Sequence, residues 1–397
     1  MSLAHGRPFL AIPGPSVFPE KVLQAMNRPE VNIYEGELVD MAFDMRKDLC
    51  TVARTAGQVA YYISNGHGAW EAAIANTLAP GDRALVLATG RFGKGWALMA
   101  EALGVEVELL DFGNATPHDL SRVESRLRAD QDHRIKAVLA VHTDTSTSIR
   151  NNIEGLRQAL DAAGHPALLQ VDCIASLACE PFEMDAWGVD VMVTGCQKGL
   201  MTPPGMAFVY FNEKADAVRS GMPRVSSYWD WRTRTRPELF YQLFCGTAPT
   251  HHLYGLRAAL DLIMAEGIQA VWSRHTKMAS AVWCAVETWG EGNAIALNVT
   301  NPDHRSTAVT TIRTEGDVAT RLRKWCETEA GLTLGIGLGI GDARAENAGD
   351  LFRIGHMGYL NPPMLMGTLG TVETGLKALG IPHGKGALER AAETLAA

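Results

Sequence analysis

The chain has 397 residues, 47% of them hydrophobic, which is enough for a substantial core and for more than one domain. Its 36 basic and 44 acidic residues give a formal net charge of −8 without a basic cluster, so we expect no nucleic-acid partner. No apolar run approaches the roughly 18 residues of a membrane span, the N-terminus lacks a signal-peptide pattern, and the seven cysteines show neither CxxC nor zinc-type spacing. These features predict a soluble cytoplasmic enzyme without a membrane or metal partner.

The N-terminal part contains two turn-rich stretches. Residues 12–16 (IPGPS) cannot form regular structure, a short helix is expected at residues 19–26, and residues 31–40 are expected to be an irregular polar loop. Farther on, a β-prone run ends at Asn65-Gly66 and a helical pattern follows. Because backbone N–H groups are open at such a helix start, this turn suits an anion, although an ordinary tight turn explains it equally well.

Two further turns follow expected strands. Residues 84–88 precede TGRFGKG, which is not a Walker loop because its spacing is wrong. Within it, Phe92 suits either a plate stacked on a flat ring or an ordinary core aromatic. After the strand expected at residues 135–141, residues 142–148 (HTDTSTS) place many hydroxyl groups at the sheet edge where open α/β folds bind ligands. Turns and helix caps use the same residues, so both interpretations stay open.

Residues 168–205 are the most informative stretch, with two short apolar runs that predict buried strands. Asp172 closes the first run, and Gln197-Lys198 follow the second. An acid and a lysine at strand ends suit pyridoxal phosphate, which binds through a lysine Schiff base and an acidic partner for its ring nitrogen. A solvated lysine and a loop-capping aspartate are the plainer alternative.

Alternating apolar strands and helices from residue 60 to 210 predict a mainly parallel sheet covered on both faces. A loop-like insertion at residues 226–237 and a long helix at 251–264 are expected next. After Gly267, a smaller α+β domain is expected, with helices at 268–288, 318–327 and 366–379 and strands at 306–313 and 351–354.

Arg353 places a charge between two apolar residues of the last expected strand. A charge in such a strand is rarely buried without a partner. Its partner is either a structural carboxylate or the carboxylate of a substrate, which a guanidinium binds as a bidentate fork.

Together these stretches resemble class V aminotransferases of pyridoxal phosphate fold type I, especially the serine–glyoxylate and alanine–glyoxylate branch. The resemblance implies an α/β fold with an N-terminal arm (1–20), a large cofactor-binding domain (21–265) around a mainly parallel seven-stranded sheet, and a smaller C-terminal α+β domain (266–397). The similar runs span most of the chain: IPGPSVFP, NGHGAWEAAIANTLAPGD, HTDTSTS, VDCIASLACEPFEMDAWGVDVMVTGCQKGLMTPPG, LYGLRAALDLI and FRIGHMGYLNP.

The resemblance also implies roles for individual residues. Lys198 is implied to be the catalytic Schiff-base lysine and Asp172 the catalytic partner of the pyridinium nitrogen. Arg353 is implied to receive the substrate carboxylate, with Gly14 also at the substrate. A homodimer with shared active sites is implied, because one cofactor contact crosses the interface. The other implied cofactor-binding residues are Gly66, His67, Gly68, Phe92, Thr145, Ser146, Gln197 and, from the partner subunit, Thr247.

Three departures from the family pattern leave the amino donor open. Phe244 stands where relatives often have a tyrosine near the phosphate, residues 34–37 differ from the usual His- and Ser-containing loop, and Ser148 replaces a glycine.

The implied activity is ping-pong transfer of an amino group from a small L-amino acid, serine or alanine, to a 2-oxo acid, glyoxylate. The alternative on the same fold is a lyase or cysteine desulfurase, for which Cys326 is the candidate cysteine, although its helical pattern suggests a core or surface role. A third hypothesis is a nicotinamide oxidoreductase or binding module that uses the glycines of residues 335–341, which are out of register for a dinucleotide fingerprint.

Overall fold

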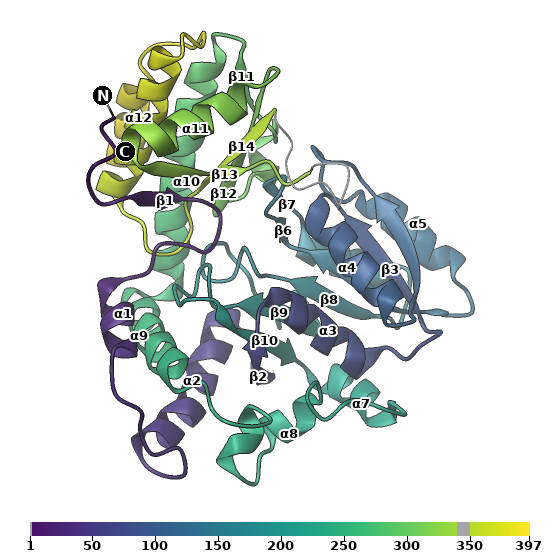
Figure 1. The fold of residues 1–397 in the computed structure, drawn as a ribbon. Coiled ribbons are helices and arrows are strands. Elements are labelled where there is room, and N and C mark those ends of the chain that lie inside the picture. The colour runs from purple at the N-terminus through teal and green to yellow at the C-terminus, as the bar shows by residue number, and fades with distance from the viewer. Residues whose placement is uncertain (1, 340–349) are drawn as a thin grey trace.

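A seven-stranded sheet dominates the computed structural model, which describes residues 2–339 and 350–397 (Figure 1). Its strands run in the order β2-β10-β9-β8-β5-β3-β4. β10 is antiparallel to both neighbours, and the other pairs are parallel, so the predicted mainly parallel sheet is confirmed. The strands are β2 (Gln58–Ser64), β3 (Arg83–Ala88), β4 (Glu106–Asp111), β5 (Ile135–Val141), β8 (Leu168–Asp172), β9 (Val191–Gly195) and β10 (Gly205–Phe211).

Helices cover both faces of this sheet, as buried parallel strands require. On one face, α3 (Gly66–Thr77), α4 (Arg91–Ala102), α7 (Glu213–Gly221) and α8 (Trp231–Thr235) share a core rich in small residues and tryptophan. The other face is buried under α1 (Glu20–Met26), α2 (Glu37–Ala53), α5 (Leu120–Ala129), α6 (Ile153–Ala162) and α9 (Thr250–Glu266).

A second sheet, in the order β1-β13-β14-β12-β11, forms the smaller unit, drawn at the top of Figure 1. Strand β1 (Phe9–Ala11) comes from the N-terminal arm and pairs in parallel with β13 (Leu332–Ile336), so the arm contributes to the small unit. The domain boundaries at residues 20 and 265 remain predictions. The other elements of this unit are α10 (Ile268–Gly290), β11 (Ile295–Leu297), β12 (Val309–Thr314), α11 (Val318–Ala330), β14 (Leu351–Gly355), α12 (Pro362–Ala378) and α13 (Ala387–Ala396).

Four helices lie where none was expected, one of them α7. α2 begins at Glu37, inside the stretch expected to be irregular, because Leu38 starts a stripe of buried apolar residues along it. α8 interrupts the expected loop insertion, anchored by the fully buried Trp231. α13 follows the helix that was expected to be last. No helix in the described ranges is long and apolar enough to cross a lipid bilayer.

The two units meet at the hydroxyl-rich turn between β6 (Thr143–Asp144) and β7 (Ile149–Arg150). Each backbone carbonyl from residue 145 to residue 148 accepts a hydrogen bond from the small unit. The turn that carries two predicted site residues is therefore held from the small unit as well as from the large sheet. The pairs are Arg353 Nη1 to the Thr145 carbonyl (2.9 Å), Thr311 Oγ1 to Ser146 (3.1 Å), Asn298 Nδ2 to Thr147 (2.8 Å) and the Ser306 N–H to Ser148 (3.1 Å).

Candidate active site

A cavity of about 580 Å³, here called the central cavity, lies between the two sheets. It gathers eight of the predicted site residues from segments far apart in the sequence: Gly14, Gly66, His67, Phe92, Thr145, Gln197, Lys198 and Arg353. Its other lining residues are Ile12, Pro13, Pro15, Asn65, Trp70, Ile174, Pro204, Thr333, Leu334, Gly335, Ile336 and Leu338.

Lys198 follows β9, and its side chain is buried in the central cavity. Its Nζ donates a hydrogen bond to Thr145 Oγ1 at 3.0 Å. Burial, and then the positive charge of Arg353, lower the pKa of Lys198 from 10.5 to about 8. A substantial fraction of this amine is therefore neutral, and nucleophilic, near neutral pH.

Asp172 ends β8, and its carboxylate is buried beside the cavity. Its Oδ1 accepts a hydrogen bond from the Ile174 N–H (2.6 Å), and its Oδ2 accepts one from Trp70 Nε1 (3.0 Å). Burial raises the pKa of Asp172 to about 7, although both hydrogen bonds and the nearby Lys198 act in the opposite direction. The ionised form thus depends on these donors.

The N-terminus of α3 forms another wall of the cavity. Asn65 caps this helix, because its Oδ1 accepts hydrogen bonds from the N–H groups of His67 (3.1 Å) and Gly68 (3.3 Å). The predicted anion site therefore shares its donors with a capping side chain. Gly68 itself does not line the cavity, and a Cβ there would collide with Ser64 Oγ, which accounts for the glycine by packing.

Gln197 and His67 add two polar side chains to the cavity wall. The buried amide oxygen of Gln197 has no hydrogen-bond partner among the described residues. The His67 ring lies 4.7 Å from the Trp70 ring, and burial, followed by the charges of Arg91 and Lys198, lowers its pKa. His67 therefore enters the cavity as a neutral ring at neutral pH.

Phe92 lies at the start of α4, and its ring centroid is 5.8 Å from Lys198 Nζ. The N–H groups of Phe92 (2.9 Å) and Gly93 (3.3 Å) donate to Asp144, whose carboxylate is fully buried. Ser146 donates to the same carboxylate through its N–H and its hydroxyl, so it lies behind the cavity wall rather than in the lining. Asp144 thus ties the turn at residue 145 to the helix that carries Phe92.

Arg353 projects from β14 into the cavity. Its Nε donates to the Ile336 carbonyl (2.7 Å) and its Nη1 to the Thr145 carbonyl (2.9 Å). No carboxylate lies within ion-pair distance of it among residues 2–339 and 350–397. Burial lowers the pKa of Arg353 to about 9. Because Arg353 donates to carbonyl groups and pairs with no protein carboxylate among the described residues, the carboxylate of a ligand is favoured as its partner.

Gly14 lies against Lys198 in the central cavity, whereas Thr247 lies outside it. A Cβ at Gly14, whose φ is +104°, would lie 2.9 Å from Lys198 Cε, so a side chain there would press on the lysine. Thr247 is exposed and does not line the cavity of its own chain. The implied phosphate contact of Thr247 therefore requires a second copy of the chain and stays a prediction.

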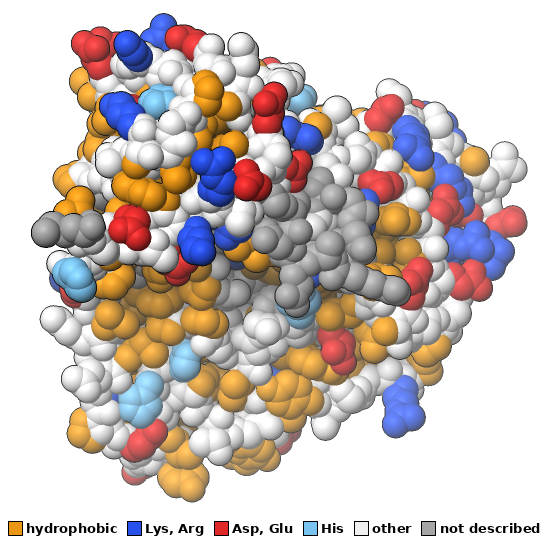
Figure 2. All heavy atoms as spheres, turned by 45° about the horizontal axis from the view of Figure 1, so that its top comes forward, with side chains coloured by type: hydrophobic (Ala, Val, Ile, Leu, Met, Phe, Trp, Pro, Cys, Tyr) orange, Lys and Arg blue, Asp and Glu red, His pale blue; other side chains and the backbone are white. Residues whose placement is uncertain are grey.

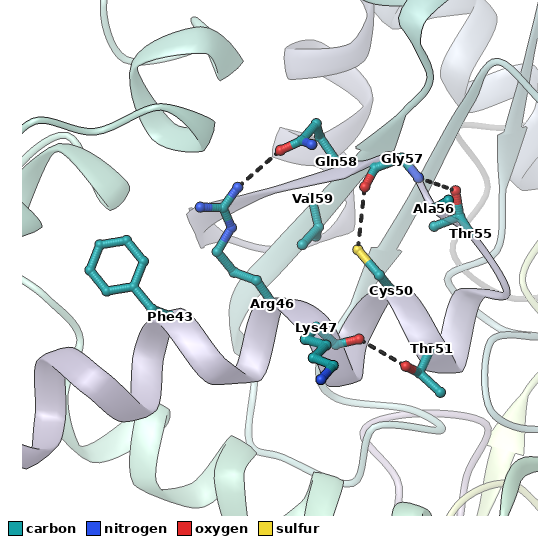
Figure 3. A pocket seen from close by; sticks show the side chains of 10 residues that line it. All are labelled: Phe43, Arg46, Lys47, Cys50, Thr51, Thr55, Ala56, Gly57, Gln58 and Val59. Carbon is teal, nitrogen blue, oxygen red and sulfur yellow. Dashed lines mark hydrogen bonds between the residues drawn. The ribbon is translucent and has the colours of Figure 1, made fainter.

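A separate hollow of about 420 Å³ lies between α2 and β2 (Figure 3). Figure 3 shows Arg46 bonded to the side chain of Gln58, and Cys50 turned toward the Gly57 carbonyl. Burial raises the pKa of the Cys50 thiol to about 11, so the thiol is protonated at neutral pH and a poor nucleophile. None of the predicted site residues lies in this hollow.

Two residues of the site were missed from the sequence. Trp70 was part of an apolar helical pattern, and Asp144 stood inside a hydroxyl-rich run. Both act through contacts with segments distant in the chain, Trp70 with Asp172 and Asp144 with the start of α4. The only local signals were an aromatic residue four positions after the glycine turn and an acid among hydroxyls.

The residues of the central cavity fit pyridoxal phosphate. The amine of Lys198 suits its aldehyde, the carboxylate of Asp172 suits its ring nitrogen, and the Phe92 ring offers a flat surface. The start of α3 and the side-chain NH2 group of Gln197, which lines the cavity, offer N–H donors for a phosphate. Fold and cavity together define a pyridoxal phosphate enzyme.

Comparisons with known proteins identify the family. Residues 11–338 match the family described as aminotransferase class-V. An L-aspartate–glyoxylate aminotransferase from Paracoccus denitrificans is 37% identical over 94% of this chain and 91% of its own. A serine–glyoxylate aminotransferase from Methylorubrum extorquens is 35% identical over 95% of this chain and 92% of its own. The structure of an alanine–glyoxylate aminotransferase from Nostoc sp. is 28% identical, with a TM-score of 0.84 over 94% of this chain and 96% of that one.

The chain therefore belongs to the class V aminotransferases, and it is a transaminase that uses pyridoxal phosphate. The alternative hypotheses find no support in the described residues. Cys326 is buried on α11 outside the cavity, and burial raises its thiol pKa to about 12. Gly335 lies in β13, packed against Pro13 and Arg353. Gly341 lies outside the described residues.

Proposed function

We propose that this aminotransferase moves the amino group of a small L-amino acid, serine or alanine, to glyoxylate in two successive half-reactions. The observation that carries the proposal is a buried guanidinium, Arg353, in the same cavity as Lys198 and next to apolar walls. The names of the relatives from Paracoccus and Methylorubrum support glyoxylate as acceptor.

Each residue has one task in this proposal. When bound, pyridoxal phosphate supplies an aldehyde that reacts with amines and a ring that accepts electrons. Arg353 binds the α-carboxylate of the amino acid and orients its Cα–H bond. The neutral amine of Lys198 takes the α-proton on Nζ and later returns it, as general base and then acid. The carboxylate of Asp172 holds the proton on the ring nitrogen.

The cavity walls favour a donor with a small neutral side chain. Among the described residues that line the central cavity, Arg353 is the one guanidinium, and His67 is neutral at neutral pH. The apolar lining of the cavity includes Ile12, Leu334 and Ile336, and the Ile336 carbonyl accepts a hydrogen bond from Arg353. A second carboxylate, as in aspartate, would find no second guanidinium to pair with among the described residues that line the cavity. Tyr34, in the divergent loop, is exposed and does not line this cavity.

Single-turnover titration of the loaded enzyme against serine, alanine and aspartate tests this proposal. Serine or alanine should bleach the visible absorbance of the cofactor, and glyoxylate should restore it. Bleaching by aspartate alone would overturn the donor assignment. Lys198→Ala should abolish turnover, and normal turnover in that variant would refute the role of Lys198.

The same proposal includes a homodimer with shared sites. Thr247 is exposed near Tyr241 and Leu239, large apolar side chains that remain exposed in the single chain, and Phe43 of α2 packs beside this segment. On the face drawn in Figure 2, apolar side chains gather over the lower half. Sedimentation equilibrium at micromolar concentration should give twice the chain mass of 42.9 kDa. A monomer that retains full activity would refute shared sites.

We place the enzyme in the cytoplasm as part of this proposal. All seven cysteines are unpaired thiols, which favours a reducing compartment. Fractionation of cells that express the chain tests this assignment, and recovery outside the cytoplasmic fraction would refute it.

A further inference from the structure

A single hydrogen bond links the tryptophan-rich core to the acid of the site. Trp70 Nε1 donates to Asp172 Oδ2 at 3.0 Å, inside the protein. The reaction proposed above assigns no role to this contact. Trp70 lies on α3, more than a hundred residues before Asp172 in the chain. The contact therefore exists only in the folded protein.

The Trp70 ring is held in place by other rings. It stacks on Trp96 of α4 with centroids 5.8 Å apart and an angle of 14° between the planes. Phe92 meets it edge-on at 6.3 Å, and His67 at 4.7 Å. Both tryptophans are fully buried. The indole N–H is thus aimed at Asp172 by packing and needs no rearrangement to donate.

Asp172 has few other donors to support its charge. Besides Trp70, the Ile174 N–H donates to its other oxygen. A carboxylate has about four lone-pair positions, so both bonds leave room for a ring N–H. Hydrogen bonds to an ionised acceptor are roughly twice as strong as neutral ones, so each donor favours the ionised form.

We propose that Trp70 is a positioning residue for the transamination proposed above: its indole N–H holds the Asp172 carboxylate ionised and oriented, so that the carboxylate keeps a proton on the ring nitrogen of pyridoxal phosphate. The indole N–H is a neutral and rigid donor, and it acts on Asp172, whose burial alone would favour the protonated acid. A carboxylic acid in that position has no charge with which to retain the ring proton.

The surroundings of Asp172 agree with this assignment. The charged groups that act on it are Lys198, which favours its charge, and Asp144, which opposes it. The neighbouring thiol of Cys173 is protonated at neutral pH and adds no charge, because burial raises its pKa well above the usual value. The pKa of Asp172 is already raised to about 7 with Trp70 in place. Loss of the indole donor therefore raises it further and leaves more of the acid protonated at neutral pH.

The chain offers a matched pair of variants. Trp70→Phe and Trp96→Phe each replace one of two stacked, fully buried indoles by a smaller ring, and of the two only Trp70 also lines the central cavity. The Trp96 N–H has no hydrogen-bond partner among the described residues. Both variants remove part of the same ring stack, but only Trp70→Phe removes a donor from Asp172.

The holoenzyme variants should therefore differ in three measurements. Trp70→Phe should lower kcat about tenfold or more, with a smaller change in KM, because the lost bond supports a charge used during turnover. The pH midpoint of the cofactor's visible absorbance should rise, because a proton on the ring nitrogen disfavours a second positive charge on the cofactor. Trp96→Phe should keep the wild-type midpoint and a kcat within about threefold. Equal effects of the two variants would overturn the proposal.

A second readout needs neither cofactor nor activity. In the full-length apoprotein labelled with ¹⁵N-tryptophan, the indole signal that Trp70→Phe removes should move with pH around 7, and Asp172→Asn should stop this movement. A signal that does not titrate would refute the contact. If the wild-type enzyme transfers no amino group, the proposed function fails, while this titration still decides the role of Trp70 toward Asp172.

Discussion

The lowered pKa of Lys198 predicts how the apoprotein takes up its cofactor. The aldehyde of pyridoxal phosphate reacts with a neutral amine, so the rate of uptake follows the deprotonated fraction of Lys198. The shift from 10.5 to about 8 corresponds to about 3 kcal/mol. At pH 7 it raises the neutral fraction from about 0.03% to about 9%, roughly 300-fold.

Stopped-flow absorbance between pH 6 and pH 10 measures this profile. The uptake rate should rise with pH and level off above about pH 8, because the amine loses its proton there. Arg353→Met should move the midpoint upward, since the charge of Arg353 is the second largest cause of the shift after burial. Arg305→Met is the control, because Arg305 is also buried in the small unit but lies outside the central cavity.

The reasoning would be refuted by a wild-type midpoint near 10, which would show that burial does not destabilise the ammonium form. An equal shift in both arginine variants would show that the effect comes from a general disturbance of the small unit rather than from charge in the cavity.

Three further predictions concern single residues. Thr311→Val should lower the free energy of unfolding by about 1–2 kcal/mol in urea, because the Ser146 carbonyl loses its donor. The exposed Thr374→Val should cost less than about 0.5 kcal/mol, and equal costs would contradict the importance of the contact between the units. Phe244→Tyr should destabilise the protein by about 1–3 kcal/mol, because Phe244 is buried against Tyr61 and the added hydroxyl would be buried there. It should not tighten cofactor binding, and tighter binding would show that the added hydroxyl reaches the cofactor. Cys326→Ala should keep kcat within about twofold, and release of sulfide from cysteine by the wild-type enzyme would argue for the desulfurase alternative.

Local patterns were enough to predict much of the fold. The strand expected at residues 135–141 coincides with β5, and the short helix ending at Met26 was also anticipated. These elements have strong periodicity and clear turns at their ends, which are properties of neighbouring residues. The resemblance then named Lys198, Asp172 and Arg353, which the structure brings to one cavity or its edge.

Elements without a strong local pattern were not anticipated. α8 has five residues and is held by a buried tryptophan, so its stability comes from packing rather than from propensity. Strand β1 has three residues and becomes a strand only because β13 pairs with it. The helix start at Glu37 was hidden by the polar residues around it.

The sequence by itself determined the order of the strongly patterned elements, because these depend on residue types at short spacing, and its resemblance to class V aminotransferases indicated the cofactor and predicted Lys198 as its lysine. Only the tertiary structure decided which groups support them. Asp144 became a link between two segments, Asn65 a cap on the predicted anion site, and Trp70 a donor to Asp172. Such roles depend on distances between residues far apart in the chain, and those distances are set by the packing of helices on the sheet.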